Sequence, residues 1–256
     1  MHYFTGLALV ILGSACRSID IELGPFERCG PNSNTRAWSE SDAVRIAQEM
    51  EMQVPRIREL KGIQKPAPLV VVSKEPLPWI LSGLATPLMV LIGPASRSEE
   101  RLTLVHELAH WFRDSAWNRL PSCVEEGLAM HIAGVLLPVE ASWHYQPFSF
   151  CTPDTVDLES FREACAAVID PAREHLGKDS PRLRAIGFVV ASSLGIPALR
   201  ELCERAEREG LAKVPADWIY MALPLHHIAG GSWKAANNRR MNEIDDAAKR
   251  VRAGAE

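Results

Sequence analysis

Residues 106–110 read His-Glu-Leu-Ala-His, and this stretch decides both the expected fold and the expected chemistry. Two histidines four positions apart lie one helical turn apart on the same face, so the imidazoles of His106 and His110 can reach one metal ion. Glu107 projects beside that metal, where a carboxylate can take a proton from a metal-bound water. The stretch therefore predicts a hydrolytic site on a helix, with Zn²⁺ as the cofactor.

The flanking residues favour the helix that this site needs. Ser96 to Glu99 has the pattern of a capping box, with Ser96 as N-cap and Glu99 reaching back to it. Glu99 to Arg113 contains no Gly or Pro and carries apolar residues at helical spacing. A polar, solvated face fits this stretch poorly, because the neighbours of the two histidines are apolar.

A catalytic zinc needs a third protein ligand, and two adjacent carboxylates compete for that role. Ser122 to Glu125 reads as a second capping box that opens a helix running to about Leu137. In such a box Glu125 bonds the Ser122 amide, which leaves Glu126 to turn toward the metal. Gly127 follows, and glycine inside a helix is tolerated where another backbone comes close. Glu126 is the favoured ligand, with Glu125 as the alternative.

With residues 126–129 reading Glu-Gly-Leu-Ala, the chain resembles the gluzincin metallopeptidases, which carry two histidines on one helix and a glutamate on the next. The likeness is greatest to the aminopeptidase N-like branch and to small bacterial peptidase MA-like proteins. It covers roughly residues 88–137. It departs from the thermolysin-like branch, because Met130 stands where those enzymes carry an Asp. The resemblance implies Glu107 as general base and three zinc ligands: His106, His110 and Glu126.

The surrounding sequence and the resemblance together predict an α+β, zincin-like fold. A small N-terminal α/β lobe over about 38–137 carries the zinc helix, and a mainly helical lobe over about 138–256 follows. Short apolar runs predict strands at Leu69–Val72 and Leu88–Ile92. In the resembled family the strand before the zinc helix forms the cleft edge and pairs with substrate backbone, which by order is Leu88–Ile92. A buried core strand is the alternative there.

Periodicity and prolines divide the rest of the chain. A helix is expected from Trp38 to Leu60, bent or interrupted near Pro55. Loops are expected from Lys74 to Pro87 and, aromatic-rich, from Val139 to Asp157. Further helices are expected at about 158–169, 182–194 and 197–209, and the polar segment 238–252 is expected to be a solvated final helix or a frayed tail.

Catalysis also needs a donor that stabilises the oxyanion formed on the attacked carbonyl. Related enzymes use a Tyr or His from the C-terminal part, and no spacing selects among the candidates here. Tyr145 and Tyr220 rank first. His131 is interpreted as a core residue, with contact to a metal ligand as the alternative. The remaining candidates are His144, His226 and His227.

The N-terminus predicts export to the bacterial periplasm or cell envelope. Phe4–Ala15 is an apolar run too short to span a bilayer and about right for a signal-peptide core, so residues 1–15 are the expected signal peptide. Cys16 follows small residues as a lipidated cysteine does, which would anchor the protein to a membrane, and residues 16–37 read as a linker. Two alternatives remain: ordinary cleavage after Ala15, and a buried N-terminal element of a cytoplasmic protein.

Cysteine usage agrees loosely with export. No pair has the spacing of a structural zinc site, and an exported chain is expected to form some disulfides. A disulfide at Cys123 would brace the connection between the two ligand helices. The six cysteines are Cys16, Cys29, Cys123, Cys151, Cys165 and Cys203.

Composition limits the function further. A net charge of -4 without a basic cluster makes nucleic acid an unexpected partner. The expected activity is zinc-dependent hydrolysis of peptide bonds in a peptide or protein substrate. Two alternatives stay open: a non-catalytic envelope protein that uses a zincin fold for binding or scaffolding, and a zinc hydrolase of cell-wall amide linkages. The oligomeric state is not predicted.

Overall fold

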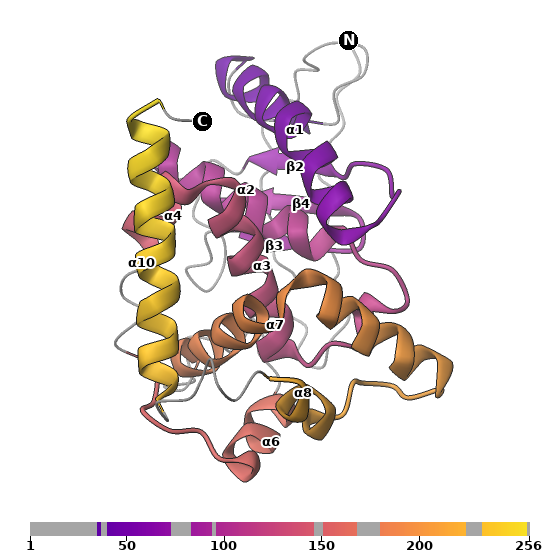
Figure 1. Ribbon diagram of the computed structural model, residues 1–256. Helices are drawn as coiled ribbons and strands as arrows, with labels where there is room; N and C mark the ends of the chain where they lie inside the picture. The colour runs from indigo at the N-terminus through magenta and orange to yellow at the C-terminus, as the bar shows by residue number, and fades with distance from the viewer. Residues whose placement is uncertain are drawn as a thin grey trace.

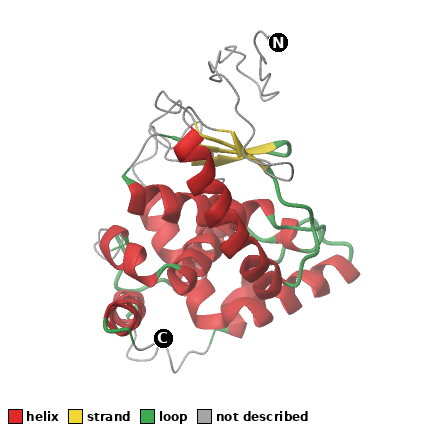
Figure 2. Ribbon diagram, turned by 90° about the horizontal axis from the view of Figure 1, so that it is seen from above, coloured by secondary structure: helices red, strands yellow, loops and turns green. Residues whose placement is uncertain are grey.

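A small sheet lies at one side of a body of helices, and the protein is mixed α+β and mostly helical (Figure 1, Figure 2). The computed structural model describes residues 35–36, 40–72, 83–93, 96–145, 151–167, 180–223 and 232–254. The predicted signal peptide and Cys16 lie outside these residues. Among the described helices, Pro181–Arg208 is long and apolar enough to cross a membrane, but 56% of its apolar window is buried, as in the core helix of a soluble protein.

The sheet has the order β1-β2-β4-β3. β1 (Thr35–Arg36), β2 (Leu69–Val72) and β4 (Met89–Ile92) are parallel, and β3 (Gly83–Ala85) pairs antiparallel with β4. β1 comes from the end of the segment interpreted as a linker, and β3 comes from the segment expected to be loop.

The expectation that Leu88–Ile92 forms the edge of the sheet is wrong. β4 lies between β2 and β3, and all four of its residues are buried. A continuous apolar run is typical of such an interior strand, because both of its faces are covered. The edge strand nearest the helix with the His-Glu-Leu-Ala-His stretch is β3.

The first two helices follow the sequence pattern. α1 (Glu40–Lys61) continues through Pro55 without the interruption that was one expectation there, and Gly62 follows it with a φ of 66°, the left-handed conformation that glycine adopts after a helix. α2 (Arg97–Trp111) begins after Ser96, whose side chain accepts a hydrogen bond from the Glu99 N–H, which is the N-cap half of the predicted capping box.

The second predicted capping box does not form. α3 (Ser122–Leu136) has Pro121 as its N-cap, and Ser122 is already its first helical residue. The Pro121 carbonyl accepts the first helical hydrogen bond from the Glu125 N–H at 2.9 Å. The Glu125 side chain is therefore available for a different contact.

The C-terminal part is helical, with one correction. The segment expected as an aromatic loop starts with α4 (Pro138–His144), because proline at the first helical position suits a helix start. α7 (Ser180–Arg208) is interrupted at Gly195, where φ is 76°, which agrees with the two helices predicted on either side. The other elements are η2 (Trp117–Arg119), α6 (Leu158–Ala166), α8 (Ala216–Ala222) and α10 (Trp233–Arg252).

One hydrophobic core runs through both predicted lobes, and α3 crosses α7 at its centre. Two glycines allow the crossing. A Cβ on Gly127 would lie 1.9 Å from the Gly187 carbonyl carbon, and one on Gly187 would lie 1.7 Å from the Cys123 carbonyl oxygen. The close approach that Gly127 predicted is thus to α7, and not to the neighbouring ligand helix α2.

Candidate metal centre

Three side chains from α2 and α3 converge at the predicted site. The Nε2 atoms of His106 and His110 are 3.1 Å apart, and the Glu126 carboxylate oxygens lie 3.2 Å from His110 Nε2 and 3.5 Å from His106 Nε2. Tetrahedral zinc ligands at about 2.1 Å from the ion are separated by about 3.4 Å. The three groups therefore have the spacing of one zinc-binding triad, and they form the metal-ligating cluster found among the described residues.

Glu125 is a neighbour of the triad. Its carboxylate oxygen Oε1 lies 3.3 Å from His110 Nδ1 and accepts a hydrogen bond from Arg113 at 2.7 Å. A carboxylate on Nδ1 keeps the proton on that nitrogen and leaves Nε2 as the ligand. Both adjacent glutamates thus serve the site, Glu126 as candidate ligand and Glu125 through His110.

The charges of the cluster shift its pKa values strongly. Burial alone would lower the pKa of His110, but the carboxylates of Glu126 and Glu125 outweigh it and raise that pKa to about 10. Burial opposes ionisation of Glu125, but His110 and Arg113 lower its pKa to about 2. The pKa of Glu126 is held well below its ordinary value by both histidines, against burial. Without metal, His110 carries the proton that a metal ion would displace.

Glu107 lies beside the triad and under the edge strand. It is 8% exposed, and burial, together with the charge of Glu126, raises its pKa. The charges of His106 and His110 oppose that rise, and so does a backbone hydrogen bond from Ala85 on β3. A Cβ on Gly83 would lie 2.7 Å from Glu107 Cγ, so only glycine lets β3 lie this close. A candidate base is thus held between the triad and the edge of the sheet.

An arginine that no sequence pattern indicates lies next to the triad. Arg184 on α7 places Nε 3.4 Å from Glu126 Oε2, and its side chain is 27% exposed. Tyr145, at the end of α4, is buried, and burial raises its pKa while Arg184 opposes the rise. The sequence offered no signal for Arg184, because its place depends on the crossing of α3 and α7.

The structure places the candidate oxyanion donors in different parts of the protein. Tyr145 lies near Arg184 and Glu126, with its ring edge-on to Phe188 at 6.1 Å. Tyr220 is not at the site, because its hydroxyl on α8 donates to the Val156 carbonyl at 3.3 Å and its ring packs against α6. His144 Nε2 lies 3.5 Å from the Ser98 hydroxyl. His226 and His227 lie outside the described residues.

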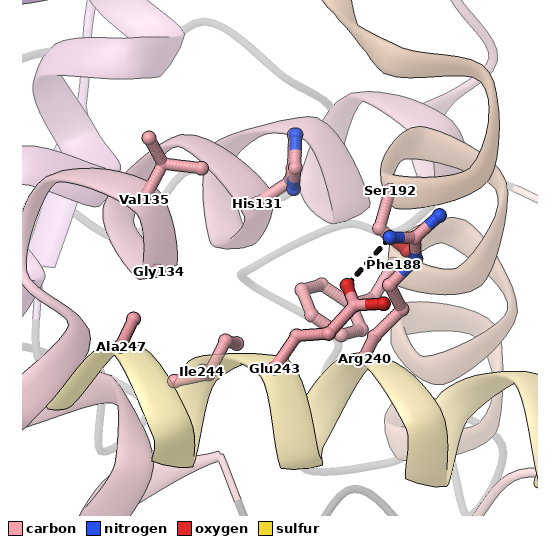
Figure 3. A pocket seen from close by; sticks show the side chains of 9 residues that line it. All are labelled: His131, Gly134, Val135, Phe188, Ser192, Arg240, Glu243, Ile244 and Ala247. Carbon is pink, nitrogen blue, oxygen red and sulfur yellow. Dashed lines mark hydrogen bonds and ion pairs between the residues drawn. The ribbon is translucent and has the colours of Figure 1, made fainter. Parts of the chain in front are cut away.

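A separate cavity of about 230 Å³ lies between α3, α7 and α10 (Figure 3). It includes His131 and Phe188, and Arg240 donates to Glu243 at 2.5 Å across its α10 wall. Burial, with the nearby charge of Arg240, lowers the pKa of His131 to about 4. His131 is therefore a neutral residue of this cavity, and none of the three candidate ligands lines it.

A buried lysine contacts the last turn of α2 on the side of α1. Lys61 is 5% exposed, and its Nζ donates to the Ala109 carbonyl at 2.7 Å and lies 5.0 Å from the centre of the Trp117 ring. Burial lowers its pKa to about 7, although Glu125 raises it. Lys61 therefore fixes the last turn of α2 directly beside His110.

The comparisons with known proteins add no relative: no family model, no curated protein and no solved structure matches the chain.

Proposed function

We propose that the protein is a zinc-dependent peptidase with a zincin-like fold, related in plan to the gluzincins. The observation that carries the proposal is the spacing of the His106, His110 and Glu126 ligand atoms, which fits tetrahedral zinc, with a buried glutamate alongside. The order of elements supports it, since the antiparallel edge strand β3 and the interior strand β4 are followed by one ligand helix and then by a second.

Each residue of the site has a role in this proposal. A bound zinc ion supplies a Lewis acid that polarises a carbonyl and makes water acidic. Glu107 takes the proton of the attacking water and delivers it to the leaving amine. The burial of Glu107 favours this role as proton acceptor and donor, because a carboxylate with a raised pKa holds a proton more readily. Glu125 orients His110, and Arg113 fixes Glu125.

Strand β3 is the proposed binding edge for substrate. Within the described residues, β3 pairs only with β4 and stands at the end of the sheet, and its Ala85 backbone bonds Glu107. An extended peptide that adds to such an edge is held by main-chain hydrogen bonds. Its scissile bond would then pass beside the general base.

The test is a digest of a peptide library by the zinc-loaded protein, with and without a chelator, and with cell-wall fragments in a parallel arm. We expect metal-dependent peptide cleavage that Glu107→Gln abolishes while still binding zinc. Glu99→Gln makes the same change on the same helix and is expected to retain activity. A wild type that cleaves no peptide refutes the peptidase, and cleavage confined to the cell-wall arm assigns the amide-linkage alternative instead.

The proposed location is the cell envelope, from residues 1–15 as signal peptide and Cys16 as lipid anchor. Mass spectrometry of the mature N-terminus distinguishes the forms: a diacylated Cys16 is expected, whereas an unmodified chain starting at Cys16 shows ordinary cleavage after Ala15. An intact Met1 in envelope-free fractions contradicts export.

A further inference from the structure

The cavity between α3, α7 and α10 has a buried floor and an exposed rim (Figure 3). Phe188, which is 1% exposed, and Ser192 form the floor on α7. Val135 on α3 and Glu243 on α10 stand at the rim, and each is about half exposed. Gly134 carries no side chain on the α3 wall, which leaves room there. A small molecule can therefore enter from solvent and reach the floor.

The size and lining of the cavity suit a small organic molecule. Its volume is about 230 Å³. An apolar cavity of about 150 Å³ is large enough to hold benzene, whereas sites for drug-sized ligands measure about 300–1,000 Å³. Much of the wall is apolar, since it includes Phe188, Ile244 and Ala247. Burial of apolar surface therefore supplies most of the attraction for a molecule with a single ring.

One polar side chain of the wall is without a hydrogen-bond partner. Within the described part of the chain, no hydrogen bond joins the ring of His131 to another residue. Burial, with the nearby charge of Arg240, lowers the pKa of His131 to about 4, so the ring is neutral near pH 7. A neutral imidazole has one N–H donor and one acceptor nitrogen. A ligand hydroxyl, which both donates and accepts, can bond with either nitrogen.

The charged side chains of the wall neutralise each other. Arg240 donates to Glu243 Oε2 at 2.5 Å along α10. An anionic ligand would have to compete with Glu243 for the guanidinium, and a cationic ligand would have to compete with Arg240 for the carboxylate. The Ser192 hydroxyl already donates to the Val189 carbonyl at 3.2 Å. The cavity therefore favours a neutral ligand, because entry of a charged group would leave that charge desolvated and without a free partner.

We propose that this cavity is a binding site for a small, uncharged molecule with an apolar body and one hydroxyl group, and that His131 recognises the hydroxyl. The apolar body packs against Phe188 and Ile244, and the hydroxyl bonds with the imidazole. The site does not depend on the proposed peptidase activity, because none of the three candidate metal ligands lines the cavity.

The first experiment tests the chemical class on the wild-type protein by calorimetric titration. The probe 4-methylphenol should bind with a Kd of about 1 mM or tighter, and no detectable binding at about 10 mM refutes the site. Anionic 4-methylbenzoate and cationic 4-methylbenzylamine should bind at least about tenfold more weakly. Tighter binding of 4-methylbenzoate would assign recognition to Arg240 and overturn the proposal. Binding should persist after a chelator removes bound metal, and its loss would place the probe at the metal centre.

The second experiment tests the residues, with p-xylene as the probe that carries a methyl group in place of the hydroxyl. His131→Phe should weaken 4-methylphenol relative to p-xylene by about 3- to 10-fold, the worth of one neutral hydrogen bond. An unchanged ratio refutes recognition by His131. Ala247→Leu should fill part of the cavity and weaken both probes by about tenfold. Ala235→Leu makes the same change at an exposed position of α10 and should bind both as wild type. Equal binding by these two variants places the probes elsewhere.

Discussion

Replacing Gly127 by alanine is expected to disrupt both the fold and the metal centre. The new Cβ would lie 1.9 Å from the Gly187 carbonyl carbon, 2.1 Å from its oxygen and 2.3 Å from the Phe188 nitrogen. All three atoms are backbone, so no change of rotamer relieves the contact. α3 and α7 must separate by about 1.5 Å to restore an ordinary contact of 3.4 Å.

The magnitude follows from two opposing effects. Alanine is better than glycine in a helix by about 1 kcal/mol. Overpacking costs about 1–3 kcal/mol when side chains can adjust, and more when backbones must move. We therefore expect Gly127→Ala to lower the free energy of unfolding by at least about 2 kcal/mol. We also expect weaker zinc binding, because ligand distances tolerate only about 0.2 Å and Glu126 moves with α3.

Gly134→Ala is the matched control on the same helix. Its Cβ would meet Ile244 Cδ1 at 3.2 Å and Tyr145 Cε2 at 3.7 Å, both side-chain atoms, and Ile244 Cδ1 is the end of a flexible chain. Its stability should stay within about 1 kcal/mol of wild type. Urea unfolding of the metal-free proteins and competition for zinc with a chromogenic chelator measure both effects. Equal urea midpoints for Gly127→Ala and Gly134→Ala would refute the requirement for glycine where α3 crosses α7.

Three further perturbations test other parts of the structure. Zinc affinity should rise about tenfold per pH unit between pH 6 and 8, because the metal displaces a proton from His110, whose pKa is about 10 without metal. Calorimetric titrations of Glu125→Gln with zinc should show an affinity that rises less steeply with pH. A pH dependence identical to that of the wild type contradicts the pairing of Glu125 with His110. The pKa of Lys61 is about 7 in the folded protein and 10.5 in the unfolded chain, so the free energy of unfolding should rise with pH across that window by up to about 1.4 kcal/mol per pH unit. Urea unfolding of Lys61→Met at several pH values should lack this rise. The same pH dependence in the variant and the wild type would contradict the lowered pKa of Lys61. The Cys165 thiol is hydrogen-bonded to the Cys123 thiol, so an exported chain should join the two cysteines by a disulfide. Non-reducing peptide mapping should detect this disulfide in the wild type and not in Cys165→Ser. Alkylation of both thiols in protein isolated from the envelope would contradict the disulfide.

The sequence predicted the parts of the site whose placement is local. His106 and His110 lie on one face because helical periodicity puts them there, and Glu126 follows on the next helix. The role of Glu125 does not follow from the sequence, because the pattern from Ser122 to Glu125 predicts a capping box with Ser122 as N-cap. Pro121 occupies that position instead, and it freed the Glu125 side chain to bond His110.

The parts that depend on distant contacts could not be predicted. β3 has three residues and becomes a strand through pairing with β4, so no periodicity marked it. Arg184 reaches Glu126 only because Gly127 and Gly187 let α3 and α7 touch. Tyr220 was a reasonable donor from its residue type, but its hydroxyl bonds the Val156 carbonyl.

The same crossing sets an order of events during synthesis. The candidate ligands lie between residues 106 and 126, so α2 and α3 leave the ribosome well before α7, which begins at Ser180. Until α7 arrives, the glycine face of α3 is uncovered and Glu126 lacks the guanidinium beside it. A nascent chain can therefore bring its ligands together early, but the complete site is a late product of translation.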